Sequence, residues 1–203
     1  KFNIKTSESI QIEFIKNMTF WRVAFTGLLV VIPIAVYSEL WSIEFLKRKY
    51  LFSKANAGLI NFMTFLGIGI GGIFFGIIGD YYKDYLITIK KSLIVCLITF
   101  IIIIKLSTAS LTLQMLLHFI LGFSSSSMLY CFSINKELSG SNSGSAIALT
   151  NCIVMLGGAI FQPLFGIILD YLEYRFVASS FELGFLAISC SYIIGFFVIP
   201  RKI

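Results

Sequence analysis

The sequence predicts an all-α membrane protein whose six transmembrane helices form two inverted three-helix repeats. Hydrophobic residues make up 58% of its 203 positions and charged residues only 13%, which is too apolar for a soluble core of this size. Two long apolar runs also end alike, in Gly76–Tyr81 (Gly-Ile-Ile-Gly-Asp-Tyr) and Gly166–Tyr171 (Gly-Ile-Ile-Leu-Asp-Tyr). These runs are the second and fifth, so an odd number of crossings separates them. We therefore expect the two triplets to be inverted relative to each other.

The six predicted spans follow from the length that a bilayer requires. A hydrocarbon core about 30 Å thick takes about 20 apolar residues in a helix. The third span is the weakest, because Lys90, Lys91 and Lys105 must reach the interfaces along their aliphatic stems. The predicted spans are 21–40, 55–78, 89–108, 111–132, 146–169 and 181–199.

Residues 1–20 are mixed and polar, which predicts a cytoplasmic linker or interfacial segment rather than a signal peptide. The chain begins with Lys1 rather than Met, so we expect a piece of a longer protein or a processed product. Residues 42–54 and 138–145 are predicted to be loops, the first charged and the second rich in Gly and Ser.

The net charge of +6 is interpreted as a topology signal and not as a nucleic-acid surface, because the cations lie mostly between spans. Most of the 16 Lys and Arg residues fall on one side if both termini are cytoplasmic, which is the orientation we predict. The sequence has no phosphate-binding P-loop, so an ATP-driven pump is not supported. Neither a disulfide framework nor a metal site fits the four cysteines, which fall one to a span, at Cys96, Cys131, Cys152 and Cys190. We therefore expect no metal and no cofactor.

Several stretches carry a resemblance to a known family. Gly72–Asp84, followed by Lys90 and Lys91, resembles the signature loop of the major facilitator superfamily, in which a glycine, an aspartate and basic residues join two helices. Segments 33–46, 121–138 and 144–170 resemble the C-terminal half of one bacterial branch, which is similar to the group of lysosomal dipeptide uniporters and their bacterial relatives.

This resemblance covers roughly residues 20–200. It implies that the six spans are half of a twelve-helix secondary carrier, with a missing N-terminal six-helix half as partner. The implied activity is transport of a small polar solute by alternating access across a bacterial cytoplasmic membrane. A dipeptide, an amino acid and a sugar all remain open as the solute, and so does the coupling ion.

The resemblance also implies roles for the helix ends and the glycines. Gly76, Asp80 and Lys83 correspond to the family's cytoplasmic latch between conformations. Small residues let helix backbones approach closely in lipid, so static packing and a sliding contact with the missing half are both open. The expected helix-packing residues, including a proline that suits a bent helix, are Gly72, Gly76, Gly157, Gly158, Pro163 and Gly166.

Polar residues in or beside the spans are candidates for solute binding or proton coupling. Glu39 lies near the end of the first predicted span among aromatic residues, where a carboxylate prefers to be protonated or paired. His118, the only histidine, fits either a relay or a hydrogen bond to a neighbouring helix. Asn151 and Gln162 are three helical turns apart and share roughly one face of the fifth span. The candidates are Tyr37, Glu39, His118, Tyr130, Asn151 and Gln162.

Two other function classes remain as alternatives. One is a channel component or a membrane scaffold without transport activity, because half a carrier has no closed central pathway. The other is an intramembrane serine hydrolase, since Gly122-Phe123-Ser124-Ser125 faintly resembles the core of a serine-protease motif. His118 lies on the same helix and lacks an evident route to the hydroxyl with the required orientation. We expect no enzymatic activity.

Overall fold

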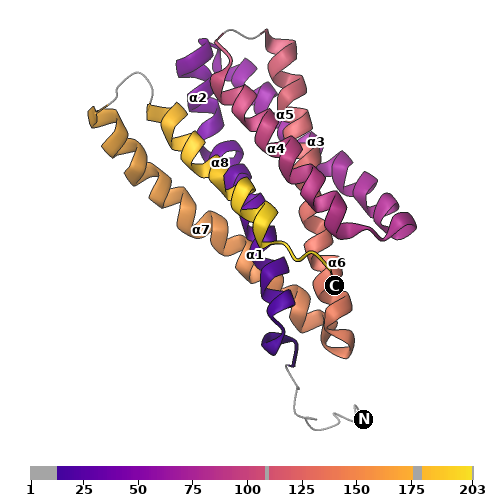
Figure 1. Ribbon diagram of the computed structural model, residues 1–203. Coiled ribbons are helices and arrows are strands. Elements are labelled where there is room, and N and C mark those ends of the chain that lie inside the picture. The colour runs from indigo at the N-terminus through magenta and orange to yellow at the C-terminus, as the bar shows by residue number, and fades with distance from the viewer. Residues whose placement is uncertain (1–12, 108–109, 176–179, 203) are drawn as a thin grey trace, which may run out of the picture.

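The computed structural model describes residues 13–107, 110–175 and 180–202, but not the side chains of Glu13, Asp80 and residues 173–175. Within these ranges every secondary-structure element is a helix or a helical turn (Figure 1). The first three spans are built from the 3₁₀ turn η1 (Glu13–Lys16), α1 (Met18–Pro33), the π-helix η2 (Ile34–Trp41), α2 (Ser42–Tyr50), α3 (Lys54–Tyr82) and α4 (Tyr85–Lys105). The last three are built from α5 (Leu111–Ser125), the 3₁₀ turn η3 (Ser126–Met128), α6 (Leu129–Leu138), the 3₁₀ turn η4 (Gly140–Asn142), α7 (Ser143–Arg175) and α8 (Ser180–Val198).

Six helical runs in the described chain are long and apolar enough to cross a membrane, which confirms the predicted number of such helices. Several of these runs join consecutive elements without a break. They are Met18–Tyr50, Lys54–Gly79, Tyr85–Lys105, Leu111–Leu138, Gly140–Leu172 and Ser180–Val198.

Short polar side chains set where three of these helices begin. Asn17 accepts a hydrogen bond from the Thr19 backbone N–H at 2.9 Å, and so caps the start of α1. Ser53 caps α3 and Ser110 caps α5 in the same way. Each cap satisfies a backbone donor that has no partner within the helix, and this fixes the first turn.

The first helical run continues where the sequence predicted a charged loop, so residues up to Tyr50 are helical. Two cations of this stretch, Lys47 and Arg48, occupy the outer face of α2, where Glu44 pairs with Lys47 at 3.0 Å and with Arg48 at 2.8 Å. Phe45 and Leu46 on the opposite face are buried. Charge density suggested a loop, but an apolar face at helical spacing together with ion pairs three and four residues apart favours a helix.

The helices pack in a scheme that leaves α3 and α7 at the margins. α1 packs against α7 and α8, while α5 packs against α3 and α4; α4 also packs against α8 (Figure 1). In its most apolar window the run Met18–Tyr50 has 72% of its residues buried, whereas those containing α3 and α7 have 28%. The first run is therefore central, whereas most residues in the apolar parts of α3 and α7 are not fully buried.

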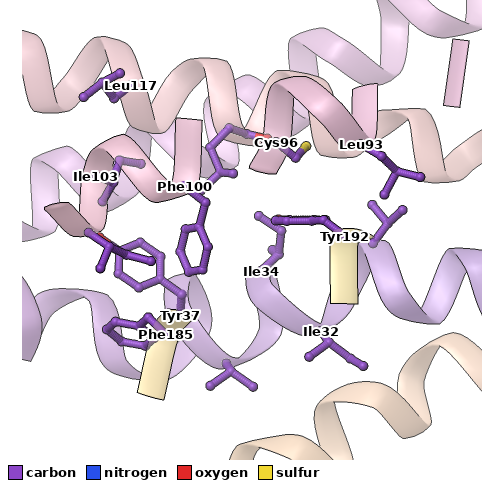
Figure 2. Close-up of a cluster of buried hydrophobic side chains, with 14 of the residues drawn as sticks. Ile32, Ile34, Tyr37, Leu93, Cys96, Phe100, Ile103, Leu117, Phe185 and Tyr192 are labelled. Atoms are coloured by element: carbon purple, nitrogen blue, oxygen red, sulfur yellow. Dashed lines mark hydrogen bonds between the residues drawn. The ribbon is translucent and has the colours of Figure 1, made fainter. Parts of the chain in front are cut away.

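An aromatic cluster holds η2 against α4 and α8. The ring centroid of Tyr37 lies 5.2 Å from that of Phe100 and 5.0 Å from that of Phe185, both with edge-to-face geometry (Figure 2). Phe45 joins the same cluster, with its ring centroid 5.3 Å from that of Phe185. Such edge-to-face pairs add to the packing energy of the buried rings.

Polar contacts fix the two ends of this central group. At one end Glu182 accepts hydrogen bonds from Lys49 at 2.6 Å and from Lys105 at 3.4 Å, and these contacts tie α8 to α2 and α4. At the other end the Arg22 guanidinium donates to the carbonyls of Val198 at 2.8 Å and Ile199 at 3.3 Å. These contacts therefore hold the first run, α4 and α8 together.

Candidate functional site

Glu39 and Gln162 come together from helices that are far apart in the sequence. The Gln162 side chain donates from Nε2 to Glu39 Oε2 at 3.1 Å and to the Ala35 carbonyl at 3.0 Å. Two of the candidates named from sequence therefore form one polar pair between η2 and α7.

This pair lies within the length of the helix and not at its tip. Residue 34 is the midpoint of Met18–Tyr50, and Glu39 is five residues beyond it, or about 8 Å at 1.5 Å per residue. The hydrocarbon core of a bilayer extends about 15 Å to either side of its centre. Glu39 is nevertheless exposed on the surface of the helix bundle. A bilayer centred on this helix would surround it with lipid unless water or another protein surface covers it.

A cavity of about 240 Å³ adjoins Glu39 between α1, η2, α3, the α5–η3 junction and α7. Its polar lining consists of Glu39, Ser125 and Ser126. Its apolar lining consists of Val31, Ile34, Phe65, Ile68, Met128 and Met155. The arrangement is a small apolar pocket with a few polar groups on its wall, as is usual for sites that bind small molecules.

Two irregular helical segments form part of the cavity wall. Pro33 ends α1 and is followed by the π-helix Ile34–Trp41, which carries Glu39. On the opposite wall α5 gives way to the 3₁₀ turn Ser126–Met128. π-Helical and 3₁₀ segments within long helices often occur at functional sites, because they redirect side chains and backbone groups.

Tyr37 and His118 form a second pair, in the buried core. The Tyr37 hydroxyl and His118 Nε2 are 2.8 Å apart, and His118 Nδ1 lies 2.7 Å from the Gln114 carbonyl oxygen. A carbonyl can only accept, so Nδ1 carries the proton in neutral His118 and Nε2 accepts from Tyr37. Both side chains have essentially no exposed surface. They connect η2 to α5 and do not line the cavity.

Tyr130 and Asn151 lie apart from these two pairs. Tyr130 is buried and donates to the Phe75 carbonyl at 2.7 Å, which ties α6 to α3. Asn151 is exposed on α7 and is not among the residues that line the cavity. Asn135, which was not among the candidates, donates to Thr150 Oγ1 at 2.9 Å and joins α6 to α7. The only indication of this contact in the sequence was an Asn near the end of one predicted span and a Thr near the start of the next.

The predicted packing glycines fall into two groups. A methyl group added at Gly157 would lie 3.4 Å from Ile32, and one at Gly158 would lie 3.4 Å from Ala35, so both let α7 approach α1 and η2. Gly166 faces Trp41 more loosely, at 3.8 Å. On α3, a methyl group at Gly72 would lie 3.4 Å from Leu129, whereas one at Gly76 would meet nothing within 4 Å. Pro163 is exposed on α7 beside Gln162.

The tightest glycine contacts join α3 and α5, at Gly67 and Gly71 of the glycine-rich second span and at Gly122, which was not predicted. A Cβ atom at Gly122 would collide with the Thr64 carbonyl, and one at Gly71 would lie 2.6 Å from the Phe123 carbonyl oxygen. Gly67 is closed in the same way by the Phe119 carbonyl. Gly67 and Gly71 are visible in the sequence as part of a glycine-rich span, but the importance of Gly122 depends on which helix lies beside it.

The structure describes only part of the predicted latch. Lys83 follows α3 in the left-handed region at φ 51°, and its side chain is exposed. Asp80 lies in the last turn of α3, with its side chain outside the described part. The latch therefore stays a prediction.

The serine and histidine considered for hydrolysis do not form a catalytic pair in this geometry. Both ring nitrogens of His118 are engaged, one by Tyr37 and the other by the Gln114 carbonyl. Ser124, the serine of that motif, is buried, and no described hydrogen bond joins its hydroxyl to His118. In the described residues, no group of three or more His, Cys, Asp or Glu side chains could hold a metal ion.

Fold and composition together indicate the class: the described part of the chain has six helices long and apolar enough to cross a membrane, which is consistent with a multi-pass membrane protein. No family model matches the sequence, and no curated protein matches it either.

Proposed function

We propose that the chain is one half of a secondary carrier of the major facilitator type, which moves a small polar solute across the membrane by alternating access. The observation that carries the proposal is the exposed Glu39–Gln162 pair beside a cavity, well inside a helix long enough to span the bilayer.

The cost of exposing a carboxylate to lipid supports this proposal. A charged side chain at the centre of a bilayer costs about 2.5–3.5 kcal/mol on insertion scales, so such groups normally face a water-filled path or the interior of a bundle. Exposed apolar residues lie close to Glu39, namely Leu40 and Met155, which are 53% and 54% exposed. A solute pathway facing Glu39 would remove this cost.

The packing scheme supports an inverted repeat. Contacts of α1 with α7 and α8 have counterparts in those of α5 with α3 and α4. The contact of α2 with α3 likewise matches that of α6 with α7. The third spans of the two triplets, α4 and α8, pack against each other. A two-fold relation between the triplets produces this set of pairs, as inverted repeats in carriers require.

The exposed surfaces of α3 and α7 could form the contact with a second six-helix half. In the proposed carrier these helices would slide against that half, with Gly76 at the open face of α3. Asp80 and Lys83 at the end of α3 would form the latch between conformations. The solute class at this level is a small polar molecule, with a dipeptide, an amino acid and a sugar among those to be tested.

The test is solute uptake by the protein as its own gene encodes it, reconstituted in lipid vesicles. We expect uptake of at least one radiolabelled member of a panel of dipeptides, amino acids, sugars and amines. Glu39→Gln should reduce the uptake rate by about tenfold or more, because the paired charge on the path is lost. Asp170→Asn is the matched control, since Asp170 is an exposed acid on α7 that does not line the cavity. Uptake no faster than in empty vesicles for the whole panel would contradict the proposal.

A further inference from the structure

We infer that the cavity beside Glu39 binds a small organic ammonium ion, with the carboxylate holding the charged nitrogen and the apolar wall holding the hydrocarbon part. This inference refines the solute class of the proposed function, but the binding site itself does not depend on transport.

The hydrogen-bonding groups at the cavity are acceptors. The Ser125 hydroxyl donates to the Leu121 carbonyl at 2.8 Å, and the Ser126 hydroxyl donates to the Ile68 carbonyl at 2.8 Å. Each hydroxyl has a single proton, so neither serine has a donor left for a ligand, and Ser125 Oγ also contacts Cys96 Sγ at 3.4 Å. The ligand must therefore bring its own donors, as an ammonium group does.

Gln162 likewise has no N–H group left to donate to a ligand. Its two N–H groups have two acceptors, the Ala35 carbonyl and Glu39 Oε2. Among the described hydrogen bonds, this arrangement engages Oε2 of Glu39 and leaves Oε1 for a ligand. Gln162 thus acts as a positioning residue that orients the carboxylate.

The charge of the wall selects a cation. Glu39 is the only ionisable side chain among the residues that line the cavity, which include no Lys or Arg. Against this wall a carboxylate or phosphate ligand would meet like charge and no donor. An ammonium ion would meet the opposite charge at close range, in surroundings less polar than water, where the attraction is stronger than in solution.

The apolar lining separates an organic ammonium ion from a metal ion. Calcium takes six to eight oxygen ligands and magnesium requires a near-octahedral set, whereas this cavity offers three polar residues and six apolar ones. Phe65 adds an aromatic ring to the wall, and the face of such a ring attracts organic cations. The volume of about 240 Å³ suits a small amine and lies below the range of about 300–1,000 Å³ usual for drug-sized ligands.

The experiment compares three ligands of the same shape on the purified full-length protein in lipid nanodiscs. Benzylammonium, benzyl alcohol and benzoate differ in charge at one group, and isothermal titration against empty nanodiscs measures their binding. We expect benzylammonium to bind at least about tenfold more tightly than either of the others, because only it satisfies the carboxylate. This comparison uses the unaltered protein, so no variant has to fold for it to be decisive.

The variants then locate the binding site. Glu39→Gln should weaken benzylammonium binding by about tenfold or more, whereas Glu39→Asp and Asp170→Asn should retain most of it. Equal binding of the three ligands, or undiminished binding by Glu39→Gln with an unchanged melting temperature, would overturn the inference.

Uptake measurements separate this inference from the proposed function. Glu39-dependent binding of benzylammonium without uptake of any solute would support the site and contradict the carrier. Uptake of neutral or anionic solutes by a protein that does not bind benzylammonium would contradict the site and support the carrier.

Discussion

At the residue scale, chemistry named the right kinds of side chain but not their partners. A lone histidine, a glutamate near aromatic residues and a glutamine before a proline stand out in any apolar sequence. The structure pairs His118 with Tyr37 in the core and Gln162 with Glu39 at the cavity. These partners are 81 and 123 positions apart, so their pairing depends on how helices pack and not on local pattern.

Tyr37→Phe tests the buried pair. The change keeps the ring in its aromatic cluster and removes only the hydroxyl, so that Nε2 of His118 is left buried without a donor. We expect a loss of about 1–2 kcal/mol in the free energy of unfolding, measured by denaturant titration in detergent micelles. Tyr81→Phe, at the exposed end of α3, is the control and should change little. Equal stability of the two variants would show that the hydrogen bond contributes nothing.

At the element scale, irregular helices and close crossings decide the shape of the site. Pro33 made a bend plausible, but an eight-residue π-helix that keeps Tyr37 buried and Glu39 exposed depends on its packing against α7 and on the contacts of Tyr37 with α4 and α8. The glycines behave in the same way. Gly76 belongs to the predicted motif and has open space around it, whereas Gly122 lies against the backbone of α3.

Gly122→Ala tests the crossing of α3 and α5. The new methyl group would collide with the Thr64 carbonyl, so the helices must separate, and we expect a loss of about 2 kcal/mol or more in stability. Gly69→Ala is the matched control on α3, because nothing lies within 4 Å of its added Cβ. That variant should be as stable as the parent or up to about 1 kcal/mol more stable, because alanine favours the helix. Thermal unfolding in the same detergent measures both, and equal effects of the two would contradict the close crossing.

At the largest scale, we predict that six crossings place both ends of the described chain on one face of the membrane. The prediction is tested with cysteines introduced at Asn17 and Lys202, in a background where the exposed Cys152 and Cys190 are serine. A membrane-impermeant maleimide should label both positions from the same side, and a cysteine at Lys54 from the opposite side. Labelling of the first two positions from opposite sides would exclude an even number of crossings and, with it, the inverted triplets.

Composition and run length were enough to predict an all-α protein with six long apolar helices, which the described residues confirm, because both depend only on local chemistry. The sequence also indicated the residue types able to bind a solute. Tertiary structure decided that the first helix continues to Tyr50, that Glu39 meets Gln162 beside a cavity, and that Gly122 forms the closest crossing. The physical reason is that hydropathy along a chain records affinity for lipid, whereas contacts between helices depend on which faces meet, and that information is spread over residues far apart in the sequence.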